Sequence, residues 1–221
     1  MHRLITLLVA VPLVVWFLRQ CRKPSGVLGA RYVRVMNIAH AALTDWGLTH
    51  VTVKPADVCL DVGCGGGRTV QKLAAMAVEG RVSGIDYSEA SVSASRRTNA
   101  DTIAAGRVTI ELGSVAALPF PDRTFDVVTA VETHYYWPHL EANLREVLRV
   151  LKPGGTLALI AETVRDRQKN PLYFVVMPLL GAAHLTTADH EAVLGRAGFA
   201  DVAVDSRASG WMCATGRRPL T

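Results

Sequence analysis

Apolar and polar residues follow two periods along this chain, and the two periods alternate. Short apolar runs that end in glycine or polar residues predict buried strands, and the segments between them carry apolar residues every three to four positions, which predicts helices. The predicted strands are 58–62, 81–86, 108–112, 125–131 and 156–161, with a final antiparallel pair at 199–204 and 211–216. The predicted helices are 31–48, 69–77, 88–105, 140–151 and 189–197. Strand–helix units with short connections indicate a doubly wound α/β fold, in which helices cover both faces of a mainly parallel sheet.

The first residues have a different pattern. Residues 4–18 read LITLLVAVPLVVWFL without a charge, and the flanking basic residues are Arg3, Arg19, Arg22 and Lys23. A helix of about 15 residues rises about 22 Å, whereas the hydrocarbon core of a bilayer is about 30 Å thick. Such a helix can lie in the membrane interface, and it can span the bilayer if its basic side chains reach the head groups.

No small residues that would mark a cleavage site follow this run, which argues against a signal peptide. Most of the positive charge lies after the run, and the positive-inside rule then places the next domain in the cytoplasm. We therefore expect residues 1–23 to be a retained hydrophobic helix that anchors the chain in the membrane, and residues 24–221 to be a cytoplasmic catalytic domain. A cleaved signal peptide and a buried helix are the alternatives.

Charge and cysteine content remove two other classes of function. Residues 1–23 account for four of the five net positive charges, so the rest of the chain is nearly neutral and offers no basic face for nucleic acid. The cysteines are Cys21, Cys59, Cys64 and Cys213, and no pair of them has metal-binding spacing. We expect free thiols, with neither a disulfide framework nor a metal site.

A glycine-rich turn follows the first predicted strand. Gly63, Gly65 and Gly67 lie at its carboxyl end, where parallel sheets bind ligands, and glycine lets a ligand approach the backbone closely. A dinucleotide-binding turn needs a third glycine at the sixth position, which is Arg68 when the count begins at Gly63. No Gly-Lys-Ser/Thr follows either, so the turn is not a phosphate-binding P-loop. The turn therefore predicts a ligand that is not bound through a pyrophosphate group of its own.

Two acidic residues lie at the ends of predicted strands. Asp61 ends the first strand, where a carboxylate attracts an ammonium group directly or through water. Asp86 ends the second strand, where a carboxylate accepts hydrogen bonds from both hydroxyls of a ribose. Its alternative role is that of an acid at a helix N-terminus. Together the turn and the acids predict a nucleoside with a free ribose.

These features resemble the class I methyltransferases that use S-adenosylmethionine (SAM). The resemblance rests on DVGCGGG at 61–67, GID at 84–86, LPFP at 118–121, FDVV at 125–128 and LKPGG at 151–155, in the order and spacing of that family. It implies a Rossmann-like methyltransferase fold with a mainly parallel, seven-stranded sheet whose last strand is antiparallel. It also implies SAM as the cofactor.

The resemblance implies roles for individual residues. The glycines would pass under the methionine part of SAM, and Asp86 would hold the ribose. Tyr87 and Val115 would flank the adenine. Ser114 lies where many members have an acid that binds the adenine amino group, and a serine hydroxyl also accepts such a hydrogen bond. The cofactor-binding residues are then Asp61, Gly63, Gly65, Gly67, Asp86, Tyr87, Ser114 and Val115.

The segment after the fourth predicted strand, ETHYYWPH at 132–139, lies at the ligand-facing edge of the sheet. His134 has the ordinary pKa of a general base, and Glu132 is the second catalytic candidate, although both residue types also occur in purely structural positions. Tyr135, Tyr136 and Trp137 would form the wall of an apolar acceptor pocket, with core packing as the alternative. His40 is a further substrate-binding candidate, because the helix before the first strand often covers the cofactor in the family that the chain resembles. Its position near the apolar stripe of that helix favours the alternative, a packing histidine with satisfied hydrogen bonds.

The apolar segment 170–185 is predicted to be a lid over the substrate, a second membrane contact or a buried helix. Together with the N-terminal run it favours methyl transfer from SAM to a small hydrophobic or lipid-like acceptor at the cytoplasmic membrane face. A SAM-binding regulatory module without catalysis and a protein methyltransferase are the alternatives. A nucleic-acid methyltransferase is disfavoured, because 132–135 lacks the Asn/Asp-Pro-Pro-aromatic motif. The oligomeric state is left open.

Overall fold

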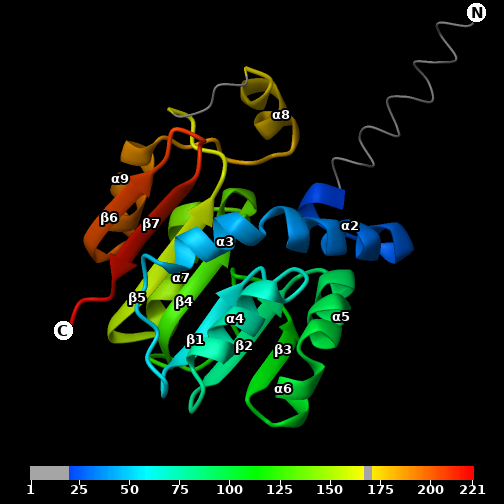
Figure 1. Cartoon of the computed structure of the whole chain (residues 1–221). Helices are drawn as coiled ribbons and strands as arrows, with labels where there is room; N and C mark the ends of the chain where they lie inside the picture. The colour runs from blue at the N-terminus through cyan, green and yellow to red at the C-terminus, as the bar shows by residue number, and fades with distance from the viewer. Residues whose placement is uncertain (1–19, 167–170) are drawn as a thin grey trace, which may run out of the picture.

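A seven-stranded sheet forms the centre of the structure, a computed structural model that describes residues 20–166 and 171–221 (Figure 1). Strands β1 to β5 pair in parallel, and β7 is antiparallel to both of its neighbours. This confirms the mainly parallel sheet predicted from the sequence. The strands, in spatial order, are β3 (Val108–Leu112), β2 (Arg81–Asp86), β1 (Val58–Val62), β4 (Phe125–Val131), β5 (Leu151–Ala161), β7 (Met212–Arg217) and β6 (Ala200–Ser206).

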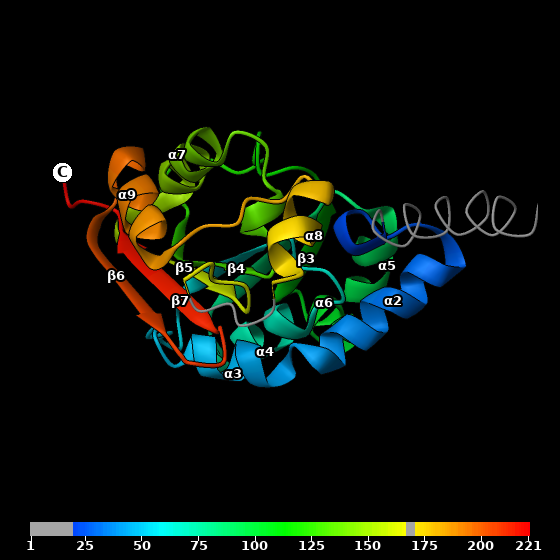
Figure 2. The ribbon, with the colours of Figure 1, turned by 90° about the horizontal axis from the view of Figure 1, so that it is seen from above.

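Helices cover both faces of this sheet (Figures 1 and 2). Helices α3, α4 and α5 pack on one face, and α7 and α9 pack on the other. The helices of the described residues are α2 (Gly26–Ala39), α3 (Ala41–Leu48), α4 (Arg68–Met76), α5 (Glu89–Thr98), α6 (Ala100–Ala104), α7 (Leu140–Val150), α8 (Tyr173–Leu179) and α9 (Thr187–Ala197), with a 3₁₀ turn, η1 (His134–Tyr136), after β4.

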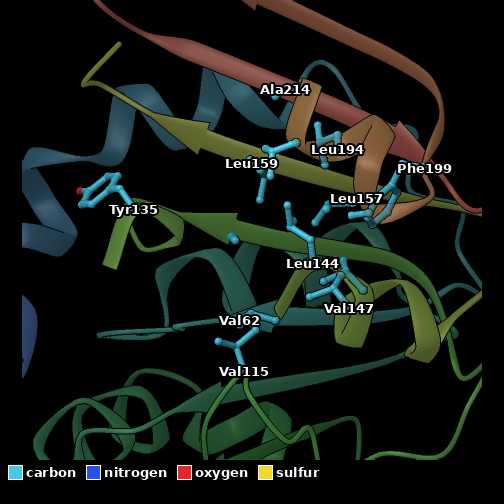
Figure 3. Close-up of a cluster of buried hydrophobic side chains, with 14 of the residues drawn as sticks. Val62, Val115, Tyr135, Leu144, Val147, Leu157, Leu159, Leu194, Phe199 and Ala214 are labelled. Carbon is cyan, nitrogen blue, oxygen red and sulfur yellow. The ribbon is translucent and has the colours of Figure 1, made fainter. Parts of the chain in front are cut away.

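The core follows the two-residue period of the strands. Leu157 and Leu159 of β5 pack with Leu144 of α7 and Leu194 of α9 on one face, as Figure 3 shows. Ile160, the next residue along β5, packs with α3 on the opposite face. Because both faces are covered, the central strands are apolar at nearly every position, as expected for a buried parallel sheet.

Two helices predicted as single elements are each divided in two. The predicted helix 31–48 is α2 and α3, separated at His40, whose φ of −88° and ψ of 9° leave the helical region. The predicted helix 88–105 is α5 and α6, separated at Asn99, whose side-chain nitrogen donates to the carbonyls of Ser95 and Gly67. In both cases a polar side chain or a local backbone change, rather than glycine or proline, divides the helix.

The turn predicted at 152–155 is part of β5. Phe125 pairs with Leu151 and Val127 pairs with Thr156, so the register of β5 shifts between these pairs and the intervening residues bulge out. Gly154 has a φ of +76°, a conformation that glycine adopts without the steric cost of a side chain. The Pro-Gly-Gly sequence therefore makes an irregularity within the strand instead of a separate loop.

The N-terminal hydrophobic helix was predicted within residues 1–23, and residues 1–19 lie outside the described part of the chain. From residue 20 to 166 and from 171 to 221, no helix has both the length and the apolar character needed to cross a bilayer.

Candidate functional site

The strand ends open into a cavity of about 430 Å³, a volume within the usual range for small-molecule sites. Val62 of β1, Ile85 of β2 and Val131 of β4 bring the carboxyl ends of three strands to it. Helix α2, the junction between α2 and α3, and helix α8 contribute the remaining walls, and Figure 2 shows these helices around the strand ends. The cavity thus joins the glycine-rich turn to the segments that follow β4 and β5.

The three predicted glycines have different structural roles. All three have positive φ, at +75° for Gly63, +49° for Gly65 and +83° for Gly67. A Cβ on Gly63 would lie 2.5 Å from Cγ2 of Thr133, and a Cβ on Gly67 would lie 2.5 Å from Oγ of Ser95. A Cβ on Gly65 would meet nothing closer than the Gly63 carbonyl oxygen at 4.0 Å. Gly63 and Gly65 line the cavity, whereas Gly67 packs against α5 and is not among the lining residues.

Asp86 lines the cavity and holds the glycine-rich turn in place. One carboxylate oxygen, Oδ2, accepts from Gly65 N at 2.9 Å, and the other, Oδ1, accepts from Ser88 N at 2.8 Å. Burial raises the pKa of Asp86, and the two backbone N–H donors oppose that rise. Each oxygen has a further lone pair, so the carboxylate can hold the turn and bind ligand hydroxyls at the same time.

Asp61 lies behind the cavity instead of lining it. Its side chain is fully buried, and Oδ1 accepts a hydrogen bond from Oγ1 of Thr129 at 2.7 Å. Burial raises the pKa of this carboxyl to about 7, with a smaller contribution from the charge of Asp86. Any contact between Asp61 and a ligand ammonium group therefore needs a mediating water, which was one of the two predicted modes.

The three residues predicted around the adenine line one part of the cavity. Tyr87 is partly exposed, and its hydroxyl donates to the carbonyl of Arg22. Ser114 Oγ accepts from Ala116 N at 3.2 Å, and Val115 is buried in the core. Their positions agree with the prediction, and their roles toward SAM remain predictions.

Glu132, which directly follows β4, dominates the other end of the cavity. It has a φ of +57°, and its carboxylate accepts from the Tyr135 hydroxyl at 2.7 Å and from Glu162 N at 2.5 Å. Burial, reinforced by the nearby charge of Glu162, raises the pKa of Glu132 to about 8. His40 faces both carboxylates, and burial lowers its pKa while Glu162 opposes that effect.

The predicted aromatic wall is present. Tyr135, Tyr136 and Trp137 all line the cavity, and they also pack against the core. Their contact with an acceptor remains a prediction. The Trp137 indole donates to Oγ1 of Thr133 at 3.1 Å, which fixes the ring beside the glycine-rich turn. The structure thus brings His40, Glu132 and the aromatic residues to the same cavity as the glycine-rich turn.

His134 does not reach the cavity. It lies in η1, 2% exposed, and its Nε2 is 2.9 Å from Nε2 of His190 in α9. His190 Nδ1 is 2.8 Å from the carbonyl of Thr186, which only accepts, so this nitrogen carries the proton. His134 Nε2 must then donate to His190, and both imidazoles are neutral. The prediction of His134 as the general base therefore has no geometric support, because its imidazole faces α9.

The buried His134–His190 pair makes stability depend on pH. Burial lowers the pKa of both imidazoles in the folded protein below the value of about 6.5 that they have in the unfolded chain. At a pH between these two pKa values, the unfolded chain therefore binds more protons than the folded protein does. Stability is full above about pH 6.5 and falls as the pH decreases below it, by roughly 1.4 kcal/mol per pH unit for each group. We expect urea unfolding between pH 7.5 and pH 5 to show this decline. The decline should weaken in His134→Gln and persist in the exposed control His139→Gln, and equal slopes in both variants would contradict the assignment.

Two cavity features were not assigned from the sequence. Glu162 directly follows β5, as Glu132 follows β4, and its position at a strand end is the signal that would have identified it. Asn37 of α2 packs so closely on the turn that a Cβ at Gly66 would lie 2.1 Å from its Nδ2. The apolar segment 170–185 was predicted to be a lid, a membrane contact or a buried helix, and the choice among these roles stays a prediction. Helix α8 and the residue after it line the cavity with Tyr173, Val176, Met177 and Leu180.

Comparison with known proteins gives this site a family context. The family model described as a methyltransferase domain matches residues 60–159, which contain the glycine-rich turn, Asp86 and Glu132. Residues 60–159 are therefore similar in sequence to a methyltransferase domain. The match bears out the predicted methyltransferase, and the predicted cofactor SAM agrees with the SAM-dependent methyltransferases among the solved structures described below.

Individual relatives extend the match beyond this domain. The chain is 41% identical over 103 residues to a demethylmenaquinone methyltransferase of Symbiobacterium thermophilum, covering 46% of this chain and 41% of that protein. It is 35% identical over 161 residues to the 2-methyl-6-phytyl-1,4-hydroquinone methyltransferase of Synechocystis sp., covering 72% of this chain and 48% of that protein. The chain therefore spans less than half the length of either relative.

Solved structures support the fold of the methyltransferase domain. A SAM-dependent methyltransferase from Aquifex aeolicus superposes with a TM-score of 0.69 at 18% identity, covering 86% of this chain and 98% of that chain. Human N-acetylserotonin methyltransferase in complex with SAM superposes with a TM-score of 0.69 at 15% identity, covering 86% of this chain and 55% of that chain. At these identities the similarity concerns the fold.

Proposed function

We propose that the protein transfers a methyl group from SAM to a small hydrophobic acceptor, of the hydroquinone type, at the cytoplasmic face of a membrane. The observation that carries the proposal is the single cavity, which runs from the glycine-rich turn and Asp86 to an apolar end lined by Tyr136, Trp137 and Met177. A donor and an acceptor bound in one cavity can be aligned for direct transfer. The names of two relatives that methylate demethylmenaquinone and a phytyl hydroquinone support an acceptor of this class.

The donor end of the cavity fits SAM. The space that a side chain on Gly65 would fill is open, and the Asp86 carboxylate keeps lone pairs for ribose hydroxyls. SAM supplies a methyl group activated by its sulfonium, so no strong nucleophile is needed from the protein. The residues of the chain bind and orient the two reactants, and Tyr136 and Trp137 exclude water from the acceptor end.

Helix α8 supports the membrane part of the proposal. Tyr173, Val176, Met177 and Leu180 have the spacing of one helical face and line the cavity. On the other side the exposed apolar residues are Leu172, Phe174, Val175 and Leu179. A helix that is apolar on both sides is unusual at a water-exposed surface. We infer that its outer side contacts lipid, which would let an acceptor pass from the bilayer into the cavity.

A lipid-borne acceptor gives a direct test. We expect faster methylation of a hydroquinone with an isoprenoid tail in vesicles than of the same ring without a tail in solution, measured with labelled SAM. The Leu179→Glu variant should slow only the vesicle reaction, because it places a charge on the outer side of α8. Leu220→Glu, at a leucine that is 80% exposed outside α8, is the matched control. Equal turnover of the two acceptors would contradict the lipid-like substrate.

A further inference from the structure

Three potential metal ligands from distant parts of the sequence meet at the acceptor end of the cavity. His40 lies between α2 and α3, Glu132 follows β4 and Glu162 follows β5. His40 Nε2 lies 4.0 Å from Oε2 of Glu132 and 3.8 Å from Oε1 of Glu162. The three ligand atoms all lie within 4.8 Å of one another. These separations are too long for direct hydrogen bonds between the ligand atoms and leave room for one atom among them.

The separations match those around a bound cation. Ligand atoms about 2.0–2.3 Å from a metal lie roughly 3–4.5 Å from one another, depending on the angle between them. A neutral imidazole nitrogen and two carboxylate oxygens are all electron-pair donors, so a cation satisfies the three at once.

The surroundings of this site differ from those of an acidic cluster on a surface. The Glu132 side chain is only 9% exposed, whereas His40 is 21% and Glu162 is 39% exposed. The Tyr135 hydroxyl donates to Oε2 of Glu132, and the backbone N–H of Glu162 donates to Oε1. Such outer hydrogen bonds orient metal-binding carboxylates in general. Thr163, next to Glu162, lines the same cavity with a buried hydroxyl that has no hydrogen-bond partner among the described residues. This unpaired hydroxyl is a second, independent indication of a ligand at this end of the cavity.

We propose that His40, Glu132 and Glu162 bind a divalent transition-metal cation at the acceptor end of the cavity. The combination of one imidazole with two carboxylates suits Mn²⁺, Fe²⁺ or Zn²⁺ better than the all-oxygen sites of Mg²⁺ and Ca²⁺. The coordination positions left open face the cavity, where they suit neighbouring hydroxyl or carbonyl oxygens of an acceptor. This use of the cation rests on the proposed function, whereas binding of the cation itself does not. This proposal departs from the sequence prediction of no metal site, because the three ligands share no local spacing in the sequence.

Titration of the full chain with Mn²⁺ tests the proposal. Calorimetry measures the binding, and electron paramagnetic resonance measures the Mn²⁺ that stays free. We expect one Mn²⁺ per chain, with affinity reduced at least about tenfold in His40→Gln and in Glu162→Gln. His50→Gln is the matched control, because His50 does not line the cavity. Its Nε2 lies 2.9 Å from Oδ2 of Asp205. Binding of S-adenosylhomocysteine, measured in parallel, shows that each variant is folded.

The outcomes separate the metal site from the proposed function. Failure of the wild-type chain to bind Mn²⁺, or equal affinity in the two cavity variants and the control, would overturn the metal site. Mn²⁺ binding that depends on His40 and Glu162, in a protein that methylates no hydroquinone, would support the metal site and contradict the proposed acceptor. A vicinal dihydroxy compound that binds more tightly with Mn²⁺ than without it would support the role of the open positions.

Discussion

Replacing Asp86 with alanine is expected to weaken the binding of SAM and of S-adenosylhomocysteine by roughly 10²–10⁴-fold. The carboxylate is predicted to accept hydrogen bonds from two ribose hydroxyls, each contributing about 1.5–3 kcal/mol when the acceptor is charged. Part of the loss arises within the protein, because Gly65 N and Ser88 N lose their acceptor and the glycine-rich turn loses its support. Calorimetry with both ligands measures the effect, and a tenfold change in affinity corresponds to about 1.4 kcal/mol.

Two further variants make this result interpretable. Asp86→Asn keeps the shape of the side chain but turns an N–H₂ group toward one of the two backbone N–H donors, so we expect a large loss of affinity here as well. Asp101→Asn changes an exposed carboxylate on α6 and should bind both ligands as the wild type does. Unchanged affinity in Asp86→Asn would show that the carboxylate does not hold the ribose.

The parts of the fold that the sequence predicted well depend on period and order. Parallel strands buried on both faces read as apolar runs, and turn residues mark their ends, so β1 to β4 have the predicted bounds. The divisions at His40 and Asn99 were missed, because the apolar period continues through both of them. Local hydrogen bonds and backbone angles decide such breaks, and a hydrophobic pattern does not contain them.

The donor end of the site was predictable for a similar reason. The glycine-rich turn, Asp86 and the residues after β3 each follow a strand end, and parallel topology brings strand ends together. The structure still divides the predicted residues into two groups, because Asp61 and Gly67 support the site from behind while Gly65 and Asp86 line it. A sequence motif records both kinds of residue without distinguishing them.

The acceptor end was predicted less well, because consecutive residues after β4 point in different directions. Glu132 has a left-handed backbone and turns toward the cavity, whereas His134, two residues later in η1, faces α9. Glu162 and His40 belong to other elements, and only the tertiary structure brings them to Glu132. Knowing that a segment lies at the ligand-facing edge therefore does not identify which of its side chains meet the ligand.

The glycine-rich turn allows a prediction that separates ligand binding from folding. Gly67→Ala should destabilise the fold by about 2–5 kcal/mol, from a left-handed conformation that costs about 1–2 kcal/mol and from overpacking that costs about 1–3 kcal/mol. Its Cβ would lie 2.8 Å from Cα of Ser95, and a backbone atom cannot move aside as a flexible side chain does. Urea unfolding of the variant and the wild type, in the absence of ligand, measures this loss.

Gly65→Ala should affect ligand binding more than stability, in contrast to Gly67→Ala. Its φ of +49° costs alanine about 1–2 kcal/mol of stability, but its Cβ meets no protein atom nearer than 4.0 Å. That Cβ would instead enter the space predicted for SAM, where overpacking by about 1–3 kcal/mol corresponds to roughly a 5- to 150-fold loss of affinity. We therefore expect Gly65→Ala to fold with a modest loss of stability and to bind S-adenosylhomocysteine weakly. Tight binding by Gly65→Ala would show that the cofactor does not approach the turn at this glycine, because the added methyl group has no other atom to displace.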